Sequence, residues 1–483
     1  MTYKIYVGNE WLESDKTLKE INPHDESVVA EVFVANKEIA RLALNKAVAN
    51  WKKTKESGNL VYERIELLHK IAKNIKAKRS KLSELVSMEN GRPITLTGSD
   101  VDRTVSIFEN TADLGKTSRD GKLLRGDVYS TPKGNENRII FLSGEPVGPV
   151  LAITPFNAPI VQLAFKIAPA ILTGCPVIVK PSPFTSGCTL EMGMLLQESG
   201  IDDNMISILP GDVPVVDQVL ESEAVRVVTF TGSSAVGKDI SRKSASTLKR
   251  VILELGGADP MLVAEDANVE AAASIAAAGR FSAAGQACNT TKRIFVHKSV
   301  AKEFSDRLLE SVRKMKVGNP LDVNTAIGPV ITENALNSLV SLVSQTKENG
   351  GTLLAGGDRM DGKGYYMHPT VLEDRKNFLL KRDVEIFGPI LPIYEFNEYS
   401  DAINYINSSK YGLQASVFTE DVRKGIKLGR MIEAGAVIIN ESDRLRWDAY
   451  PFGGVKDSGL GREGVLDAVR NYLNTKLYSV LLI

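Results

Sequence analysis

Short apolar runs alternate with longer segments of helical spacing along most of this chain. From Val147 onward, runs rich in valine and isoleucine read VGPVLAIT, CPVIVK, MISILP, VRVVTF and RVILEL. Apolar runs of this kind, separated by helical segments, predict a mostly parallel sheet with crossover helices. Ligands of such sheets bind beyond the carboxyl ends of the strands. The residues that follow each run are therefore the first candidates for a binding site.

The segments on either side of these runs predict further elements. Residues 1–11 are polar and alternating, which predicts a hairpin, and residues 37–88 repeat apolar positions at helical spacing, which predicts a helical layer. A second stretch of strands and helices, residues 258–440, is long enough for a core of its own. The apolar tail, residues 472–483, predicts a terminal strand. Because an unpaired apolar strand is an aggregation hazard, we expect this strand to be paired.

Composition and charge narrow the classes of function. The 483 residues exceed one average domain, and 43% apolar with 24% charged residues is ordinary for a globular enzyme. The 59 basic residues balance 59 acidic ones without a long basic tract, so nucleic-acid binding is not expected. The N-terminus lacks an apolar signal segment and no stretch predicts a membrane span, so we expect a cytoplasmic protein. Three cysteines and four dispersed histidines predict neither a disulfide framework nor a metal site.

The stretch GSSAVGKD, residues 232–239, follows a predicted strand and nearly matches the phosphate-binding loop of nucleotide hydrolases. That loop ends in a serine or threonine whose hydroxyl binds magnesium, whereas Asp239 stands at this position. A carboxylate there would repel phosphates unless it turned away. Two interpretations stay open: a turn that binds a phosphate group through helix N-terminal amides, or a structural turn without a ligand. A phosphate-loop NTPase is kept as an alternative hypothesis.

Cys288 stands in an unusual setting for a core cysteine, after the small residues Ala-Gly-Gln-Ala and before polar ones. It is either a small buried residue or a nucleophile, and a nucleophilic thiol needs a proton acceptor. The closest histidine in sequence, His297, belongs to a predicted strand that leads away. Glu254 ends an apolar run directly before two glycines, so it is either a solvated strand end or a partly buried base with a raised pKa.

Several motifs occur in one order along the chain, and together they carry a resemblance. They are Phe156-Asn157, Lys180-Pro-Ser182, Phe230-Thr-Gly-Ser233, Glu254-Leu-Gly-Gly257, Gly285-Gln-Ala-Cys288, Glu385-Ile-Phe-Gly-Pro389 and the run PFGGVKDSGLGREG at residues 451–464. With them the chain resembles the NAD(P)-dependent aldehyde dehydrogenase superfamily, in the branch that neither phosphorylates nor acylates coenzyme A.

The resemblance implies an α/β fold with several domains. A Rossmann-type NAD(P)-binding domain would comprise residues 1–119 and 145–255, and an α/β catalytic domain residues 256–440. A small oligomerisation projection of β structure would comprise residues 120–144 and 466–483, and residues 441–465 would form a substrate-entrance loop that returns to the cofactor domain. We further expect a homodimer or homotetramer in which the projection pairs with the C-terminal strand of another subunit.

The resemblance also implies the roles of the reacting groups. Cys288 would attack the aldehyde to form a thiohemiacetal, whose oxyanion would be bound by the Cys288 backbone amide and the Asn157 side chain. Hydride transfer would leave a thioester, and Glu254 would activate the water that hydrolyses it and help to deprotonate Cys288. Because branches that acylate coenzyme A often lack this glutamate, its presence favours release of a carboxylic acid. A non-catalytic scaffold would be expected to lose one of these three residues, and all three are present.

For the cofactor, the resemblance implies that Lys180 binds the adenosine ribose, Glu385 the nicotinamide ribose, and that Phe387 packs near the nicotinamide. Gly232 and Ser233 would lie beneath the pyrophosphate. The further cofactor-binding residues implied are Ile153, Thr154, Pro155, Phe156, Ser182, Pro183, Gly211, Val236, Leu255 and Gly256. NAD-preferring members usually carry a glutamate three residues after the lysine, where Pro183 stands. Such a glutamate would repel the 2′-phosphate of NADP. Because Pro183 carries no charge, we expect NADP to be accepted beside NAD.

The expected substrate site is less sharply defined. Arg444, Arg446 and Trp447 lie in the substrate-entrance loop, where they would bind a carboxylate, a phosphate or hydroxyls, or the arginines are surface charges. Gln162 is a further candidate. We expect a small hydroxyaldehyde, such as lactaldehyde or glyceraldehyde, or a semialdehyde, and an aromatic aldehyde is the alternative.

Overall fold

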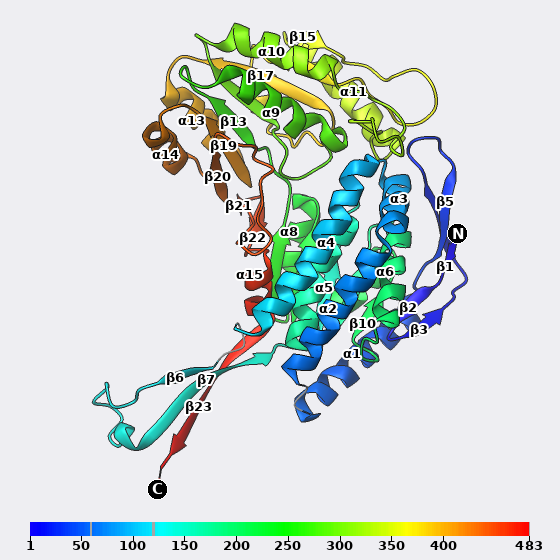
Figure 1. The fold of residues 1–483 in the computed structure, drawn as a ribbon, viewed down its shortest axis with the longest axis vertical. Helices are drawn as coiled ribbons and strands as arrows, with labels where there is room; N and C mark the ends of the chain where they lie inside the picture. The colour runs from blue at the N-terminus through cyan, green and yellow to red at the C-terminus, as the bar shows by residue number, and fades with distance from the viewer. Residues whose placement is uncertain (58–59, 118–120, 483) are drawn as a thin grey trace.

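The computed structural model describes residues 1–57, 60–117 and 121–482 of the chain. Figure 1 shows two α/β bodies arranged along the long axis, each built on its own sheet, and a thin three-stranded extension at one end. The described C-terminal residues lie at the tip of this extension, far from the second body. The mixed α/β class predicted from the sequence is confirmed.

The first sheet contains the five valine- and isoleucine-rich runs predicted as strands. In spatial order its strands are β22 (Gly459–Leu460), β12 (Arg250–Glu254), β11 (Val227–Thr231), β8 (Val150–Ile153), β9 (Val177–Lys180), β10 (Ile206–Ile208), β2 (Ile5–Val7) and β3 (Glu10–Leu12). The five runs, β12 to β10, pair in parallel with their neighbours, whereas β22, β2 and β3 pair antiparallel. β2 and β3 form the predicted N-terminal hairpin.

Helices cover both faces of this sheet. Val150 and Ala152 of β8 belong to one apolar core, and Leu151 and Ile153 to another, because successive side chains of a strand point to opposite faces. A strand buried on both faces has no polar side, which explains the continuous apolar runs in the sequence. The first core is formed by α2 (Val61–Ala77), α3 (Arg79–Asn90), α4 (Ile94–Gly115), α5 (Pro159–Thr173), α6 (Ser186–Glu198) and α15 (Val465–Asn471), and the second by α1 (Lys37–Ser57), α7 (Val213–Glu221) and α8 (Ser234–Ala245).

The second sheet forms the core of the other body, from the stretch predicted at residues 258–440. Its strands in spatial order are β15 (Thr352–Ala355), β16 (Thr370–Glu373), β17 (Ile390–Phe396), β14 (Arg293–His297), β13 (Pro260–Val263), β19 (Gln414–Phe418) and β20 (Ala436–Ile439). All pair in parallel except β15. One core lies under α9 (Val269–Phe281), α10 (Ala301–Arg313), α11 (Glu333–Glu348) and α12 (Phe378–Arg382), and the other under α13 (Tyr399–Ser408) and α14 (Val422–Met431).

The extension consists of β6 (Lys122–Leu124), β7 (Arg138–Pro146) and β23 (Leu473–Leu481). β23 pairs antiparallel with β7 of the same chain along its whole length. The expectation that the projection pairs with the C-terminal strand of another subunit is therefore wrong in this respect. The physical reason is that α15 ends beside the base of β7, where Val147 N donates to Tyr472 O at 3.0 Å, so the tail meets its own chain first.

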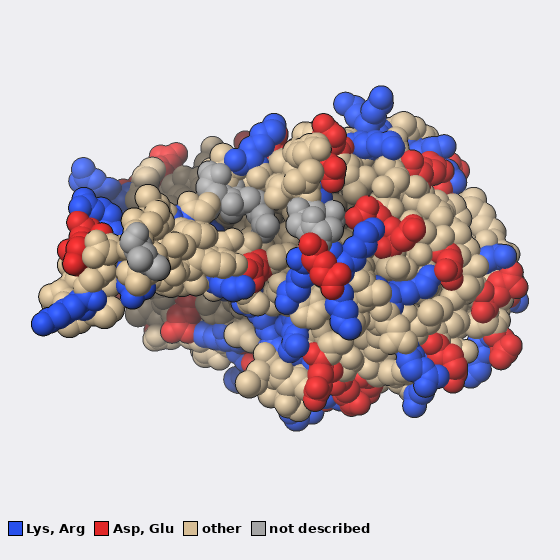
Figure 2. Space-filling model, turned by 90° about the horizontal axis from the view of Figure 1, so that it is seen from below, with Lys and Arg blue, Asp and Glu red and all other residues tan. Residues whose placement is uncertain are grey.

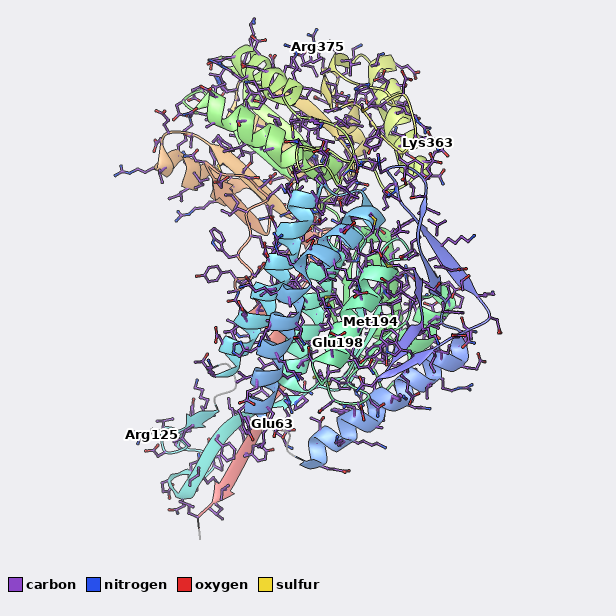
Figure 3. The ribbon with its side chains drawn as sticks, turned by 45° about the vertical axis from the view of Figure 1, so that its right-hand side comes forward. Glu63, Arg125, Met194, Glu198, Lys363 and Arg375 are labelled. Atoms are coloured by element: carbon purple, nitrogen blue, oxygen red, sulfur yellow. The ribbon has the colours of Figure 1, made fainter. Side chains whose placement is uncertain are left out.

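The bounds expected for the projection also differ from the extension. β7 continues to Pro146, and residues 466–471 belong to α15 rather than to the sheet. Asp120 and Ile483, the outer limits of the expected segments, lie outside the described residues. Figure 3 shows Arg125 on the extension and Lys363 and Arg375 toward the opposite end of the molecule.

Smaller elements complete the described chain. A three-stranded sheet is formed by β1 (Thr2–Tyr3), β5 (Val28–Phe33) and β4 (Thr17–Ile21), and β18 (Tyr411–Gly412) pairs with β21 (Val455–Lys456). Two 3-10 turns are η1 (Asn135–Asn137) and η2 (Ser282–Gly285). Basic and acidic side chains are interspersed on the face drawn in Figure 2. Among the described residues, no helix combines the length and apolarity needed to cross a membrane.

Candidate active site

The cofactor residues expected from the sequence lie mainly at one edge of the first sheet. Because its central strands are parallel, their carboxyl ends meet at this edge, where Ile153 ends β8, Lys180 ends β9 and Glu254 ends β12. The Thr154 hydroxyl is buried there without a hydrogen-bond partner among the described residues, as expected of a group that a ligand would complete. The other candidates follow the ends of β8 to β12: Pro155, Phe156 and Asn157; Ser182 and Pro183; Gly211; Gly232, Ser233 and Val236; Leu255 and Gly256.

The turn between β11 and α8 presents a helix N-terminus at this edge. Ser233 is the N-cap of α8, and its hydroxyl accepts a hydrogen bond from Val236 N at 3.5 Å. A Cβ at Gly232 would lie 2.4 Å from the Phe230 ring, so only glycine fits this turn. A glycine turn at a helix N-terminus is suited to bind a phosphate group through its amides.

Lys238, which matches the lysine of an NTPase loop, and Asp239, which replaces its hydroxyl residue, both face other partners. Lys238 Nζ lies 2.5 Å from Asp457 Oδ2, so its ammonium is already paired. Asp239 pairs with Arg242 at 2.6 Å and with Lys243 at 3.1 Å on the exposed side of α8. The carboxylate turns away from the helix N-terminus, and the lysine that an NTPase needs is engaged by another group.

Two further cofactor candidates come from the second body. Glu385 and Phe387 lie in the loop between α12 and β17. Gly257 N donates to Glu385 Oε1 at 3.1 Å, and a Cβ at Gly256 would lie 2.3 Å from Glu385 Oε2, so the glycines allow this carboxylate to approach. The rings of Phe387 and Phe156 are 6.0 Å apart. The fold thus brings candidates that are far apart in sequence close to one another.

Cys288 lies in the loop between η2 and β14, and its side chain is half-buried. Three consecutive residues ahead of it, Ala283, Ala284 and Gly285, have left-handed φ angles of 54°, 52° and 68°. A Cβ at Gly285 would lie 2.4 Å from the Gly388 carbonyl oxygen. The left-handed alanines cost about 1–3 kcal/mol each, and such strain persists only where the surrounding structure holds it.

The surroundings of Cys288 favour its protonated thiol. Burial raises the pKa of the Cys288 thiol to about 12; Lys292 acts against this shift, and Glu254, Asp259 and Glu385 add to it. Because the thiolate is the nucleophilic form, a nearby group must accept the proton. Glu254 is the acceptor candidate that sequence analysis put forward, and it lies close enough to act on the charge of Cys288.

Glu254 is buried without a hydrogen-bond partner. Its exposed fraction is 3%, and neither carboxylate oxygen bonds to any described residue. Burial raises the pKa of Glu254 well above its usual range, and the nearby Glu463 adds to the shift. A Cβ at Gly453 would lie 2.6 Å from Glu254 Oε1, so a glycine backbone covers the carboxylate. A carboxyl group with a raised pKa is suited to accept protons near neutrality.

Sequence analysis missed the ion pair behind Glu254. Lys166 Nζ of α5 lies 2.8 Å from Glu463 Oε1 and 2.8 Å from Thr231 Oγ1, and both charged side chains are almost fully buried. Although burial acts in the opposite direction, Lys166 and Arg446 lower the pKa of Glu463. One available signal was Lys166 itself, a single cation within the otherwise apolar helix α5.

Two substrate candidates belong to this buried network. Gln162 is 8% exposed, and its side-chain nitrogen donates to both carboxylate oxygens of Glu463 and to Thr231 Oγ1, each at 3.2 Å. The Arg446 side chain is 6% exposed, lies 3.1 Å from Glu463 Oε2, and stacks on the rings of Phe165 and Phe452. Contact of Arg446 with substrate, expected from its place in the entrance loop, does not fit this arrangement, because its guanidinium is already paired inside the protein; Gln162, the separate candidate, is engaged in the same network.

The other two substrate candidates lie differently. Arg444 Nη1 donates to Ser282 Oγ, and the Arg444 carbonyl accepts a hydrogen bond from Asn289 Nδ2 at 3.3 Å. These contacts fix Arg444 beside the loop that carries Cys288. Trp447 is 54% exposed, with its ring 6.2 Å from that of Tyr450, which places it at the surface of the same segment.

Arg280 is a second residue that sequence analysis missed. It is fully buried, and its guanidinium donates to the carbonyls of Ile386 and Ile390 and to Thr290 Oγ1, each at 2.8 Å, and to the Gly388 carbonyl. Burial lowers the pKa of Arg280 to about 9. These bonds tie the loop of Glu385 and Phe387 to the loop of Cys288. An arginine inside the alanine-rich α9 was the available signal.

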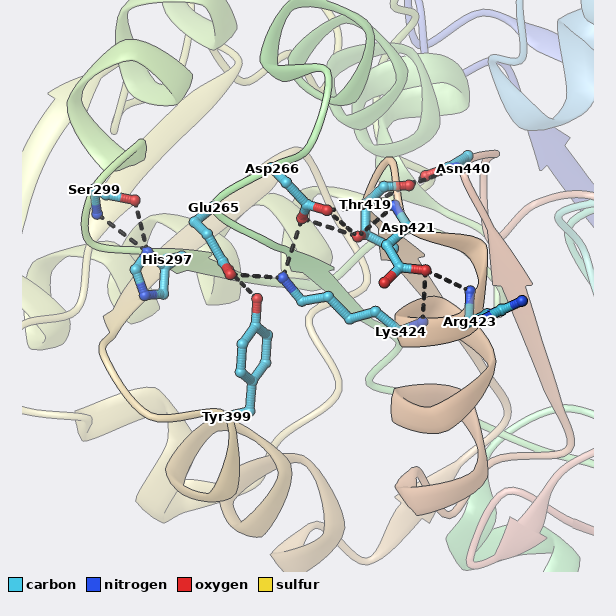
Figure 4. Close-up of polar contacts among 10 residues, drawn as sticks. All are labelled: Glu265, Asp266, His297, Ser299, Tyr399, Thr419, Asp421, Arg423, Lys424 and Asn440. Atoms are coloured by element: carbon cyan, nitrogen blue, oxygen red, sulfur yellow. Dashed lines mark hydrogen bonds and ion pairs between the residues drawn. The ribbon is translucent and has the colours of Figure 1, made fainter.

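At the corresponding edge of the second sheet, residues that follow three of its strands bond to one another. Figure 4 shows Lys424 reaching Glu265 and Asp266, with Nζ–oxygen distances of 2.7 and 3.1 Å. Thr419 Oγ1 donates to Asp266, and Asn440 Nδ2 donates to the Thr419 carbonyl at 2.8 Å. The residues beyond β13, β19 and β20 therefore satisfy one another, whereas the first sheet presents unpartnered groups.

Comparison with known proteins agrees with this architecture. The model of the aldehyde dehydrogenase family matches residues 11–478. The lactaldehyde dehydrogenase of Methanococcus vannielii is 36% identical over 478 residues, covering 98% of each chain. The 3-sulfolactaldehyde dehydrogenase of Priestia aryabhattai is 35% identical over 479 residues, covering 98% of this chain and 97% of the relative.

Solved structures agree over almost the whole length. A 3,6-anhydro-L-galactose dehydrogenase in complex with the nicotinamide cofactor NAP has a TM-score of 0.94 and 31% identity, covering 99% of this chain and 100% of its own. A betaine aldehyde dehydrogenase from Staphylococcus aureus in complex with NAD+ has a TM-score of 0.94 and 31% identity, covering 99% and 95%. This chain belongs to the aldehyde dehydrogenase family, as an oxidoreductase that acts on aldehydes with a nicotinamide cofactor.

Proposed function

We propose that this enzyme oxidises a small hydroxyaldehyde to the carboxylic acid, with Cys288 as the nucleophile and Glu254 as the base. The observation that carries the proposal is the protonated Cys288 thiol within electrostatic reach of the unpartnered, buried Glu254 carboxyl group. The substrate class is supported by relatives named for lactaldehyde and 3-sulfolactaldehyde. The polar segment around Arg444 is consistent with a substrate that carries hydroxyl or charged groups.

In the first half of the reaction, Glu254 accepts the Cys288 proton and Sγ attacks the aldehyde carbon. A C–S bond forms, and the carbonyl oxygen becomes an oxyanion. The Cys288 backbone amide and the Asn157 side chain donate to it; Asn157 is half-buried and directly precedes the N-cap of α5. The nicotinamide, when bound, supplies the hydride acceptor, so that the carbon on Cys288 is left as a thioester.

In the second half, water attacks the thioester carbon. Glu254 first releases the Cys288 proton to solvent and then accepts a proton from the attacking water. The C–S bond breaks, this proton passes to the Cys288 thiolate, and the carboxylic acid leaves. Burial and the nearby charge of Glu463 raise the pKa of Glu254, which suits it to this role, whereas Arg446 and Lys166 act against the shift. Glu254 is thus used in both halves as a proton acceptor.

The residues at the open edge of the first sheet fit a dinucleotide. The helix N-terminus of α8 would take the pyrophosphate, Thr154 has a free buried hydroxyl, and Glu385 lies against the Gly256-Gly257 backbone. Lys180 would bind the adenosine ribose. Because Pro183 is exposed and carries no charge, we propose that NADP is accepted beside NAD.

We propose that each segment of the chain has its own function. Residues 1–119 and 145–255 bind the cofactor, residues 256–440 supply the nucleophile, and residues 441–465 line the substrate entrance. The extension serves oligomerisation, as a homodimer or homotetramer. This last point is supported by apolar side chains that the isolated chain leaves exposed on the thin sheet: Leu123 at 72%, Ile139 at 43%, Leu477 at 59% and Val480 at 48%.

The test is aldehyde-dependent reduction of NAD or NADP, followed at 340 nm with lactaldehyde, glyceraldehyde and an aromatic aldehyde. We expect activity with the hydroxyaldehydes, and loss of it in Cys288→Ser, whose hydroxyl is a far weaker nucleophile. Cys188→Ser is the matched control, because Cys188 is fully buried inside α6. Activity of Cys288→Ser equal to that of the parent enzyme, or a preference for the aromatic aldehyde, would contradict the proposal.

A further inference from the structure

We propose that the preferred substrate carries a negatively charged group, which Arg444 binds beside Cys288. This inference rests on the proposed function and names the substrate class more closely. The chemistry that Arg444 would recognise is an oxyanion, namely a sulfonate, a phosphate or a carboxylate, because a planar guanidinium offers paired donors to such groups.

Arg444 has no ion-pair partner among the described residues, although its side chain is half-buried. Its recorded side-chain bond goes to the uncharged Ser282 hydroxyl. The two carboxylates that attract it are held by other groups: Asp443 accepts from Thr291 Oγ1 at 2.9 Å, and Asp100 lies 2.7 Å from Arg92 Nε. A buried charge without a partner is costly, and a bound anion would remove that cost.

Arg92 is a second cation near the same position. Burial lowers the pKa of Arg444 to about 10, and the positive charge of Arg92 is the next largest cause. Because Asp100 pairs with Arg92 at 2.7 Å, the charge of Arg92 is balanced locally, and Arg444 is the cation of the two that a bound anion would pair with. The loop of Arg92 also adjoins the proposed oxyanion site, since Asn90 Nδ2 donates to the Phe156 carbonyl at 3.1 Å.

The position of Arg444 relative to the nucleophile is held from several sides. Asn289 Nδ2 donates to the Arg444 carbonyl at 3.3 Å, and Gln414 Nε2 donates to the next carbonyl, that of Leu445, at 3.2 Å. The charge of Cys288 also acts on Arg444, whose pKa it raises. When Cys288 attacks the carbonyl carbon of an aldehyde, the other end of that molecule would therefore lie near the fixed guanidinium of Arg444.

The neighbouring arginine does not share this role. Arg446 is paired with Glu463 and enclosed by two phenylalanine rings, so a substrate anion would have to displace a buried carboxylate to reach it. Of the two arginines in this segment, only Arg444 keeps its charge available to a ligand.

The test compares kcat/KM for matched pairs of aldehydes that differ in one charged group. The pairs are lactaldehyde with 3-sulfolactaldehyde, glyceraldehyde with its 3-phosphate, and butanal with succinic semialdehyde, so that the three anions are distinguished. In at least one pair we expect the charged member to be preferred by about tenfold or more. Arg444→Gln should abolish that preference, and Arg444→Lys should restore part of it. Arg430→Gln, which removes an exposed charge on α14, should leave it unchanged.

Equal kcat/KM values within each of the three pairs for the parent enzyme would overturn the inference. So would an Arg444→Gln variant that loses both members of a pair equally, because this would make Arg444 only an anchor of the loop. Calorimetric titration with lactate and 3-sulfolactate, 3-phosphoglycerate or succinate provides a readout that does not depend on turnover. Tighter binding of at least one dianion to an enzyme that oxidises no aldehyde would leave the inference standing and refute the proposed function.

Discussion

Replacement of Glu254 by glutamine is expected to make the enzyme slower and more stable at once. Glutamine has the shape of the protonated carboxyl group but cannot accept a proton. Because Glu254 is 3% exposed and has no hydrogen-bond partner among the described residues, the substitution breaks no recorded bond. Removal of a general base typically costs about 100-fold to 10,000-fold in rate, and we expect kcat to fall in this range.

The gain in stability follows from the raised pKa. In the folded enzyme burial raises the pKa of Glu254 well above the 4.5 of the free side chain, so the proton is bound more tightly when folded. The resulting stabilisation is fully present below pH 4.5 and is lost as the pH rises through the folded-state pKa. Each pKa unit of that shift lowers the free energy of unfolding of the parent enzyme by about 1.4 kcal/mol once Glu254 ionises. Glutamine does not ionise, so the variant does not lose this stability. Glu254→Gln should therefore melt above the parent enzyme at pH 8.5, with a smaller difference at pH 5.

Stopped-flow absorbance at 340 nm distinguishes the two halves of the reaction. If thioester hydrolysis is the step most dependent on Glu254, the variant should show a rapid burst of reduced cofactor, approaching one per active site, before slow turnover. Absence of the burst would mean that Glu254 is needed chiefly to deprotonate Cys288. A kcat within threefold of the parent value, or a lower melting temperature at pH 8.5, would refute the reasoning about Glu254.

Two other predictions concern the cofactor and the assembly. Pro183→Glu places a carboxylate where it would repel a 2′-phosphate, so the ratio of kcat/KM with NADP to that with NAD should fall about tenfold or more; an unchanged ratio in steady-state assays would show that Pro183 does not set the preference. Val480→Asp puts a charge on the apolar extension and should lower the sedimentation coefficient at micromolar concentration. Val323→Asp, at an exposed valine outside the extension, should not; identical coefficients for both variants would argue against assembly through the extension.

Local sequence patterns were sufficient to predict the strands and helices that form the core of the fold. The five valine- and isoleucine-rich runs became neighbouring parallel strands, since a strand covered on both faces must be apolar throughout. The stretch 37–88 became helices because its apolar spacing matches one face of a helix. The strand with which the C-terminal strand pairs could not be predicted in this way, because pairing depends on which unpaired strand edge lies near it in space.

The same contrast holds for the candidate site. Cys288 and Glu254 could be singled out because their flanking glycines and small residues are contiguous with them. Lys166 and Glu463 are separated by 297 positions, and the sequence around each residue does not predict that the two form an ion pair. Arg444 and Arg446 look alike in the sequence, yet one is enclosed with Glu463 and the other lies beside the loop of Cys288.

By itself, the sequence determined the alternation of strands and helices, the family, and the residues with the right chemistry for a thiol nucleophile and a carboxylate base. Those features depend on periodicity and on neighbours along the chain. Only the tertiary structure decided that Thr154 and Glu254 lie unpartnered at the edge of the first sheet, whereas residues beyond three strands of the second sheet bond to one another. It also decided that Arg444 has no ion-pair partner among the described residues. These are questions of burial and charge pairing, which are set by residues far apart in sequence that folding brings together.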